Sequence, residues 1–384
     1  MEKLIKNILS QPTAPFRESW VKQACLHFCS QAGLPVFEDE IGNLWVGAEH
    51  ANHLKSARVV FVAHLDHPGI VIEQFYRKQS AIYAAGKWLG GGPMDIRSFP
   101  VKIFSDVNGL MLLDGKVESH TKGPRGPDRV KIKIEQTLLA DTACTPEGLR
   151  QLGPWGACLW YGHQGVETGV SKQKELWVTK AADDLIGVCA LLKAFENAGH
   201  PPGVVMLLSR AEESGFHGTL AVLEKGLIQP KKTLMVSIET SSQLPGAELG
   251  KGPVVRLGDR ATVFDPAFVY WVQERATELS KKKKAFRFQR KLMDGGTCEA
   301  TAFNCYGFKV AGISTPLQNY HNLSKSGKPM PEAVHTRDVE QLVLLLTHLM
   351  QAFRPGLTRE LGARTFRDYT ARLLKNQRAH EKYF

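Results

Sequence analysis

Histidines and carboxylates stand at several places along this 384-residue chain where their side chains could bind metal ions. Each place alone has an ordinary explanation: a histidine after a strand is usually a hydrogen-bonded loop residue, and an Asp-Asp pair before a helix is usually an N-cap. Together, two histidines and several carboxylates supply the nitrogen and oxygen ligands that suit Zn, Mn or Co. The candidate residues are His64 with Asp66, Asp183 with Asp184, Glu212 with Glu213, Glu239 and His321.

Two such ions would lie about 3.5–4 Å apart, so a bridging carboxylate is needed to hold their charges together. Asp183 or Asp184 could supply this bridge. One histidine and one further carboxylate on each ion would complete two open sites, with His64 on one ion and His321 on the other. The residues therefore favour a dinuclear centre with room for a bridging water.

Two neighbouring residues could support this centre. Asp66, two residues after His64, can accept the second N–H of the imidazole and so fix its tautomer. A general base must stand beside the water without being captured by an ion. Glu212, adjacent to the presumed ligand Glu213, is suited to that role.

Four short apolar runs predict strands buried on both faces, as in a parallel sheet. The helical patterns between them, such as the apolar stripe from Leu185 to Phe195, predict an α/β domain with helices on both faces of a largely parallel sheet. Thr336 is a predicted N-cap of the last long helix, and Pro355-Gly356 a predicted stop. Ligands of such sheets bind outside the carboxyl ends of the strands, where the candidate metal ligands stand. The runs are Val59–Ala63, Val204–Leu208, Leu234–Ile238 and Phe308–Ile313.

Residues 73–176 interrupt this rhythm with frequent turn residues, among them Gly90-Gly91-Gly92-Pro93. Short β-type runs between the turns predict a small β-barrel-like domain. We therefore expect a discontinuous catalytic domain, residues 1–72 and 177–384, with residues 73–176 as an inserted domain. The β-type runs are Ser80–Ala84, Val101–Phe104, Leu110–Leu113 and Val130–Ile134.

Short motifs surround the candidate residues: Ala63-His64-Leu65-Asp66 with Pro68-Gly69, Lys180-Ala181-Ala182-Asp183-Asp184-x-x-Gly187, Glu212-Glu213-Ser214-Gly215-Phe216-x-Gly218, Gly295-Gly296-Thr297 and Pro316-x-x-Asn319-Tyr320-His321. This set resembles the glutamyl aminopeptidase and tetrahedral aminopeptidase family of co-catalytic zinc exopeptidases, over all but the C-terminal end of the chain. The resemblance implies a zinc-exopeptidase-like fold. It also implies two divalent ions per chain, with Zn as the first expectation and Co or Mn as alternatives.

The resemblance also implies roles for the candidate residues. Asp183 would bridge the ions, His64 and Glu239 would hold one ion, and Glu213 and His321 would hold the other. Glu212 would be the general base and Asp66 would orient His64. Three positions depart from the family pattern: Leu185 replaces the usual Arg, Cys298-Glu299 stand where Asp is common after Gly-Gly-Thr, and Glu239 replaces the usual Asp.

We therefore expect an aminopeptidase that hydrolyses N-terminal residues from a peptide substrate. A metal-dependent carboxypeptidase or N-acyl amino-acid amidohydrolase is the alternative, because Glu at the position of Glu239 often accompanies those activities among related exopeptidases. A non-catalytic or nucleic-acid-binding protein on this fold is a remote alternative. Because the inserted domain falls where the family has its oligomerisation domain, we expect a homo-oligomer, from a dimer to a dodecamer.

The composition limits the classes of partner that this protein could bind. Lys and Arg exceed Asp and Glu by 11, but the positive charge is dispersed apart from Lys281–Lys284. That run follows a predicted helix, where basic side chains stabilise the negative end of the helix dipole. No stretch approaches the ~18 apolar residues of a membrane span, and the N-terminus reads as an amphipathic helix and not as a secretion signal. We expect a cytoplasmic protein with no nucleic-acid or membrane partner.

Overall fold

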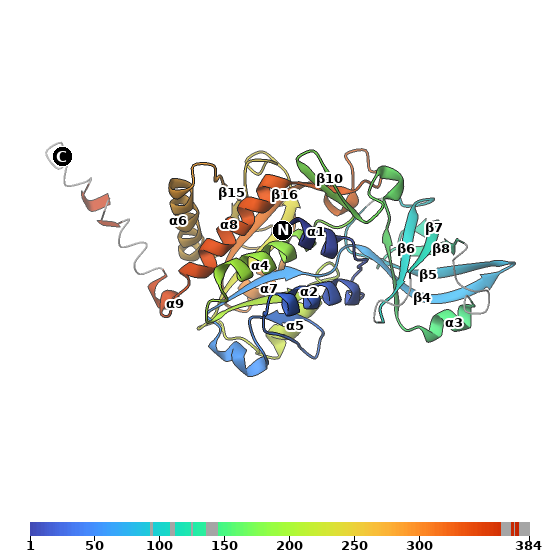
Figure 1. Cartoon of the computed structure of the whole chain (residues 1–384), viewed down its shortest axis with the longest axis horizontal. Coiled ribbons are helices and arrows are strands. Elements are labelled where there is room, and N and C mark those ends of the chain that lie inside the picture. The colour runs from blue at the N-terminus through green and yellow to red at the C-terminus, as the bar shows by residue number, and fades with distance from the viewer. Residues whose placement is uncertain are drawn as a thin grey trace.

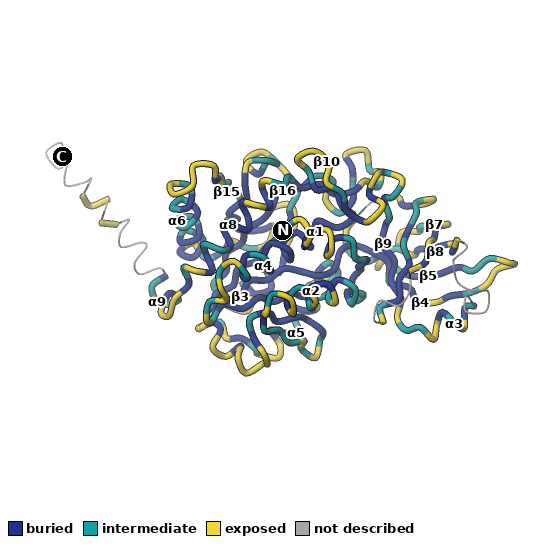
Figure 2. Tube along the Cα trace, viewed as in Figure 1, coloured by how far each residue is buried: buried dark blue, intermediate teal, exposed yellow. Residues whose placement is uncertain are grey.

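The computed structural model describes residues 1–92, 95–107, 112–123, 126–135, 145–361, 370–371 and 373–375. A large α/β body and a smaller barrel lie side by side, with the barrel at one end of the molecule and helix α9 (Leu357–Glu360) at the other (Figure 1). Each part has its own buried interior, visible as dark segments in Figure 2. Two separate hydrophobic cores are the physical mark of two domains.

The α/β body is built on an eleven-stranded mixed sheet. Its centre is the parallel set β12-β3-β13-β16, in which Ser209 of β12 lies opposite His64 of β3, and Glu239 of β13 lies opposite Ser314 of β16. All four predicted runs fall within or overlap these strands. The strands are β1 (Val36–Glu38), β2 (Leu44–Val46), β3 (Val59–His64), β10 (Val170–Gln173), β11 (Leu176–Thr179), β12 (Val204–Ser209), β13 (Leu234–Ser242), β14 (Val254–Arg256), β15 (Gln289–Lys291), β16 (Lys309–Gln318) and β17 (Glu332–His335).

Helices cover both faces of this sheet, as predicted. On β13 the Ser237 hydroxyl contacts the Sγ of Cys298 at the start of α7, whereas the Thr240 hydroxyl donates to Asp184 at the start of α4. Because residues an odd number apart on a strand face opposite ways, α4 and α7 lie on opposite faces. The helices are α1 (Glu2–Leu9), α2 (Ser19–Gln31), α4 (Leu185–Ala198), α5 (His217–Glu224), α6 (Pro266–Lys282), α7 (Glu299–Cys305), α8 (Thr336–Ala352) and α9 (Leu357–Glu360), with short 3₁₀ helices η1 (Ala51–Ser56), η2 (Gly162–Gln164) and η3 (Tyr320–Asn322).

One predicted cap is wrong. Thr336 is the first residue of α8, and the N-cap is His335, whose ring nitrogen accepts the N–H of Arg337 at 3.1 Å. An imidazole can fill this role because its unprotonated nitrogen accepts a hydrogen bond as a hydroxyl oxygen does. The predicted stop is confirmed, since α8 ends at Ala352, before Pro355-Gly356.

The smaller part is a closed antiparallel barrel in the order β4-β5-β8-β7-β6-β9. Buried and exposed residues alternate along β7 and β8, as expected for strands with one face on a core. Its strands begin at Gly69 and end at Leu159, and the division at 72/73 and 176/177 stays a prediction. Leu110 and Met111 of the expected third β-type run lie outside the described residues. The elements are β4 (Gly69–Lys78), β5 (Ala81–Leu89), β6 (Pro100–Ser105), β7 (Leu112–Thr121), β8 (Arg129–Ile134), α3 (Pro146–Gln151) and β9 (Trp155–Leu159).

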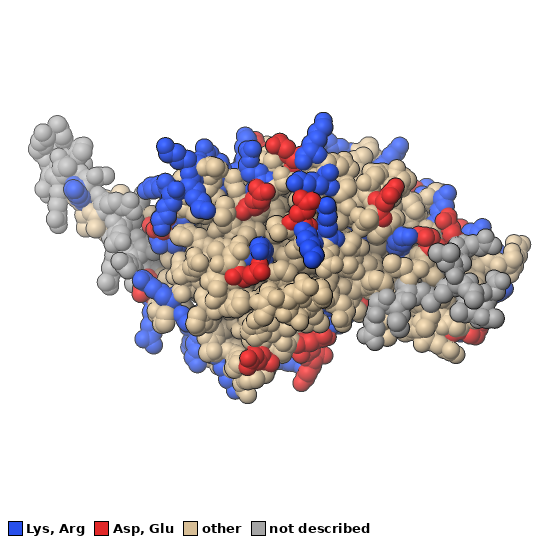
Figure 3. All heavy atoms as spheres, in the orientation of Figure 1, with Lys and Arg blue, Asp and Glu red and all other residues tan. Residues whose placement is uncertain are grey.

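The surface charge agrees with the dispersed pattern expected from the sequence. On the face shown in Figure 3, Lys and Arg are spread over the α/β body and are interspersed with Asp and Glu. Lys281 and Lys282 form the last turn of α6, where they stabilise the helix dipole. In the described part of the chain, no helix is both long enough and apolar enough to span a bilayer.

Candidate metal centre

The expected site residues converge at the carboxyl ends of the central strands. His64 ends β3, Glu239 lies near the end of β13, and His321 lies in the turn η3 that follows β16. Glu213 follows β12, and Asp183 precedes α4. Five segments far apart in the chain therefore meet at one edge of the sheet, which is where open α/β sheets bind ligands.

Asp183 lies between the two histidines. Its Oδ1 is 3.6 Å from Nε2 of His64, and its Oδ2 is 3.4 Å from Nε2 of His321. The carboxylate of Asp184 instead accepts the Thr240 hydroxyl at 2.8 Å and lies against the Cα of Gly187 in α4. Of the two aspartates, only Asp183 faces both imidazoles.

Among the described residues, three groups of side chains could each hold a metal ion. Within each group the ligand atoms lie within 4.8 Å of one another. Asp183 belongs to two of the groups, which is what a bridging residue requires. The groups are His64 with Asp183 and Glu239, Asp183 with Glu213 and His321, and His64 with Glu212 and Glu213.

Two oxygens in this cluster fit a cation. Oδ1 of Asp183 and Oε1 of Glu213 are buried and have no hydrogen-bond donor among the described residues. Oε1 of Glu213 lies 3.1 Å from Nε2 of His321, so imidazole and carboxylate lone pairs can point into one small space. Buried carboxylates of this kind are normally paired or bound to metal, and nitrogen and oxygen donors suit Zn, Mn or Co.

The histidines have strongly raised pKa values. Burial lowers the pKa of His64, but the charge of Glu212 and the contact with Asp183, 3.6 Å away, outweigh burial and raise the pKa well above its usual value. Burial likewise lowers the pKa of His321, yet the charge of Glu213 and the contacts with Asp183 raise it to about 10. The excess of negative charge around both imidazoles draws positive charge into the site, either as protons or as metal ions.

The glutamates respond to the same crowding. Burial raises the pKa of Glu239 to about 7, against the opposing charge of Arg256. Burial also raises the pKa of Glu212, well above its usual value, with a further contribution from the charge of Glu213. Perturbed carboxyl groups that share a cleft are typical of catalytic sites.

The shortest contacts of the Asp66 carboxylate are not the one expected for it. Its carboxylate accepts the backbone N–H groups of Glu212 at 2.9 Å and Glu213 at 3.1 Å. Nδ1 of His64 is 3.7 Å from that carboxylate and 3.1 Å from the backbone oxygen of Asp66. Asp66 therefore ties the end of β3 to the two glutamates that follow β12.

Glu332, at the start of β17, is a residue that sequence reasoning missed. Its Oε2 accepts the backbone N–H groups of Ala182 at 2.6 Å and Asp183 at 3.1 Å, and its Oε1 accepts that of His321 at 2.8 Å. A single buried carboxylate thus holds the backbone of two ligand segments. No spacing or motif signals this role, because Glu332 lies 149 residues from Asp183.

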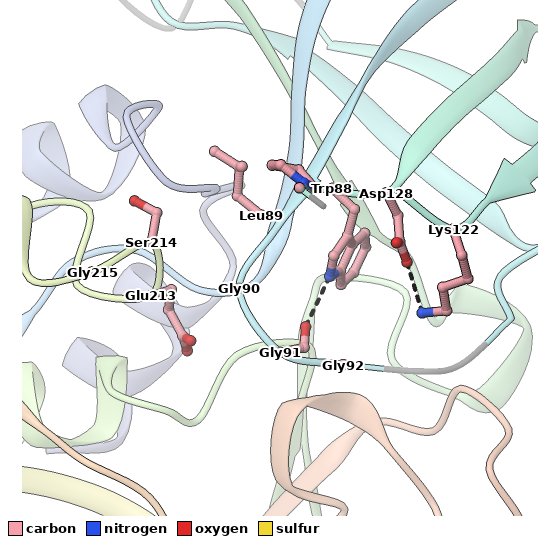
Figure 4. Close-up of a pocket in the computed structure, with 12 residues that line it drawn as sticks. Trp88, Leu89, Gly90, Gly91, Gly92, Lys122, Asp128, Glu213, Ser214 and Gly215 are labelled. Carbon is pink, nitrogen blue, oxygen red and sulfur yellow. Dashed lines mark hydrogen bonds and ion pairs between the residues drawn. The ribbon is translucent and has the colours of Figure 1, made fainter. Parts of the chain in front are cut away.

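Two cavities flank the cluster. The larger, of about 530 Å³, lies between the barrel and Glu213 (Figure 4). The smaller, of about 160 Å³, is bounded by Asp183, Glu239, Tyr320 and the Gly295-Gly296 turn, with the side chain of Arg256 in its wall. The centre is therefore open on two sides, so that both sides of a scissile bond could be accommodated.

Structural comparisons show the same fold in known peptidases. The TET aminopeptidase of the marine sediment archaeon Thaumarchaeota archaeon SCGC AB-539-E09 is 17% identical, covers 94% of this chain and 98% of its own, and superposes with a TM-score of 0.71. The TET1 peptidase of Pyrococcus horikoshii is 20% identical over 92% and 99% of the two chains, with a TM-score of 0.66. An M18-family aminopeptidase of Thermotoga maritima is 14% identical over 92% and 96%, with a TM-score of 0.63.

The sequence itself matches one family model over most of its length. The model for the M42 glutamyl aminopeptidases covers residues 42–345, which include every candidate metal ligand and the whole barrel. The chain therefore belongs to the M42 glutamyl aminopeptidase family.

Proposed function

We propose that this protein removes N-terminal residues from peptides at a dinuclear centre in which Asp183 bridges two divalent ions. Membership of the M42 family makes the chain a metal-dependent exopeptidase. In our assignment His64 and Glu239 hold one ion, and Glu213 and His321 hold the other. The observation that supports the proposal best is the carboxylate of Asp183, which directs one oxygen toward each histidine.

The residues divide the chemistry among them. Two bound ions would polarise the scissile carbonyl and would acidify the attacking water. Glu212 takes the proton of that water and delivers it to the departing amine. Asp66 positions this base through the backbone N–H of Glu212.

We propose Zn as the metal, with Co or Mn able to occupy the same ligands, since imidazole and carboxylate donors accept all three. The test is metal analysis of the purified protein, followed by chelation and re-metallation with each ion. We expect two ions per chain and activity that returns with the metal. A protein that hydrolyses peptides equally well after complete chelation would refute the metal assignment.

Peptides blocked at one end test whether the protein acts at the amino or at the carboxyl terminus of its substrate. We expect hydrolysis of peptides with a free amino terminus, whether or not the carboxyl terminus is amidated, and no hydrolysis of N-acetylated peptides. Cleavage of N-acetylated peptides that requires a free carboxyl terminus would favour the carboxypeptidase or amidohydrolase alternative. The replacement of the usual Asp by Glu239 makes this comparison informative.

We also propose that the chain forms a homo-oligomer through its barrel domain. Pyrococcus horikoshii TET1, which shares the fold, can assemble into a tetrahedron or a large octahedral shell. Light scattering should give the full-length chain a mass at least twice that of one chain, and a chain lacking residues 73–176 should give a smaller assembly. A full-length monomer, or an assembly unchanged by the deletion, would contradict this proposal.

A further inference from the structure

The barrel domain extends into the metal centre through one short glycine-rich loop. Strand β5 ends at Leu89, and Gly90, Gly91 and Gly92 follow it. In Figure 4 this loop lines one side of the larger cavity and faces the segment of Glu213 on the other. A segment of the inserted domain is therefore part of the wall around the candidate ligands.

Gly91 is the point of closest approach. A Cβ atom at this position would lie 2.0 Å from Nδ1 of His321, 2.8 Å from Cε1 and 3.2 Å from Cγ. The φ angle of Gly91 lies outside the left-handed region, so its backbone conformation is open to other residues. Space beside the imidazole, and not backbone strain, is what requires glycine here.

The loop cannot yield easily, because Trp88 anchors it. The indole N–H of Trp88 donates to the carbonyl oxygen of Gly91 at 2.8 Å, as the dashed line in Figure 4 shows. Trp88 is 7% exposed and belongs to the hydrophobic core of the barrel, and its backbone N–H donates to the backbone oxygen of Asp128. The position of Gly91 is thus coupled to the packing of the barrel.

The other sides of the His321 ring are also occupied. Tyr320 stacks on the imidazole with centroids 3.7 Å apart, and His67 approaches edge-on with centroids 6.3 Å apart. Glu332 holds the backbone N–H of His321. Gly91 closes the Nδ1 side, which leaves Nε2 directed at Asp183 and Glu213.

We propose that Gly91 is a positioning residue through which the barrel domain sets the orientation of the ligand His321. The proposal depends on the dinuclear function proposed above. The absent Cβ lets the loop lie directly against the ring, and the Trp88 hydrogen bond keeps it there. Metal affinity at the position shared by His321 and Glu213 is therefore controlled by a residue of the inserted domain.

Gly91→Ala should weaken one of the two ions selectively. The added methyl group forces the imidazole away from Gly91, and a bound ion tolerates little displacement of its ligand nitrogen. Changes to residues that orient a ligand typically lower metal affinity about 10- to 100-fold, and we expect a loss in this range. The ion held by His64 and Glu239 does not depend on this loop and should stay bound.

The experiment compares the full-length protein with three variants. Metal content is measured by mass spectrometry after equilibrium dialysis against a series of buffered Zn concentrations, and the Tm is measured in chelator to check the fold. Gly162→Ala is the matched control, because an added Cβ there meets its nearest neighbour at an ordinary 3.6 Å and lies away from both cavities. Trp88→Phe keeps an aromatic ring in the barrel core but removes the hydrogen bond to Gly91.

We expect wild type and Gly162→Ala to bind two ions with equal affinity. Gly91→Ala should retain its Tm in chelator but bind the second ion about 10- to 100-fold more weakly, and Trp88→Phe should show a smaller weakening of the same ion. Gly91→Ala and Trp88→Phe variants that bind both ions as wild type does would overturn the proposal. A wild-type protein that binds fewer than two ions would instead refute the dinuclear function.

Discussion

Glu332→Gln should weaken the metal centre although Glu332 is not a candidate ligand. The two carboxylate oxygens of Glu332 accept three buried backbone N–H groups, those of Ala182, Asp183 and His321. Glutamine offers one acceptor oxygen and one NH₂ group, so in either orientation the NH₂ group faces at least one backbone N–H. A buried donor without an acceptor costs about 1–3 kcal/mol.

If the amide oxygen stays with Ala182 and Asp183, the backbone N–H of His321 loses its hydrogen-bond acceptor. In the other orientation, the backbone N–H groups of Ala182 and Asp183 lose theirs. We therefore expect the free energy of unfolding to fall by about 1–3 kcal/mol in the first case and by roughly twice that in the second. Either way, one ligand segment loses its anchor. A displacement of that kind should lower metal affinity about 10- to 100-fold.

The assay is urea denaturation in chelator, followed by Zn titration at neutral pH. Glu299→Gln is the matched control, because Glu299 is equally buried but accepts from the hydroxyl of Thr219, which can rotate to accept from an amide instead. We expect Glu299→Gln to cost less than Glu332→Gln in stability. Wild-type stability and wild-type metal affinity in Glu332→Gln would refute this role of Glu332.

Three further outcomes are expected. Glu212→Gln should keep both ions and lose about 10²–10⁴-fold in rate, whereas Glu213→Gln should lose one ion; the reverse pattern in metal content and rate would exchange their roles. His64→Ala should lower metal stoichiometry as well as activity, and Asp66→Ala should lower metal content less; two tightly bound ions in His64→Ala would show the ligand assignment to be wrong. The raised pKa of His321, about 10, means that this side chain must release a proton to bind metal, so Zn affinity should rise as pH increases from 6 to 8. Calorimetry at several pH values should detect the released proton. A Zn affinity that is flat over this pH range would contradict the assignment of His321 as a ligand.

Much of this site could be predicted from sequence because it follows from a local rule. Buried apolar runs form the central parallel strands, and their carboxyl ends meet at one edge of the sheet. The segments that follow those runs, including His64, Glu213 and Glu239, were bound to lie near one another once the strands paired. The α/β class and the inserted barrel were likewise predictable, because hydrophobic periodicity and turn residues are local signals.

The position of each side chain within the site could not be predicted in this way. Reasoning from the residues left Asp183 and Asp184 open as the bridge, and only the packing of Thr240 and the close approach of Gly187 show why Asp184 faces α4. The cap on α8 was misplaced for a related reason, since hydroxyl and imidazole side chains compete for the same N–H groups. The orientation of Asp184 depends on Thr240, which is 56 residues away in the chain, whereas the cap depends on a choice between adjacent residues.

Glu332 and Gly91 mark the limit of sequence reasoning most clearly. Glu332 accepts hydrogen bonds from the backbone N–H groups of Asp183 and His321, and Gly91 leaves room for the His321 ring because it has no Cβ atom. Neither role leaves a pattern of residue types, because a hydrogen bond to a backbone or a close contact can be made from any element that folds into place. The sequence by itself determined which candidate ligands reach the edge of the sheet, and only the tertiary structure decided how they are held there.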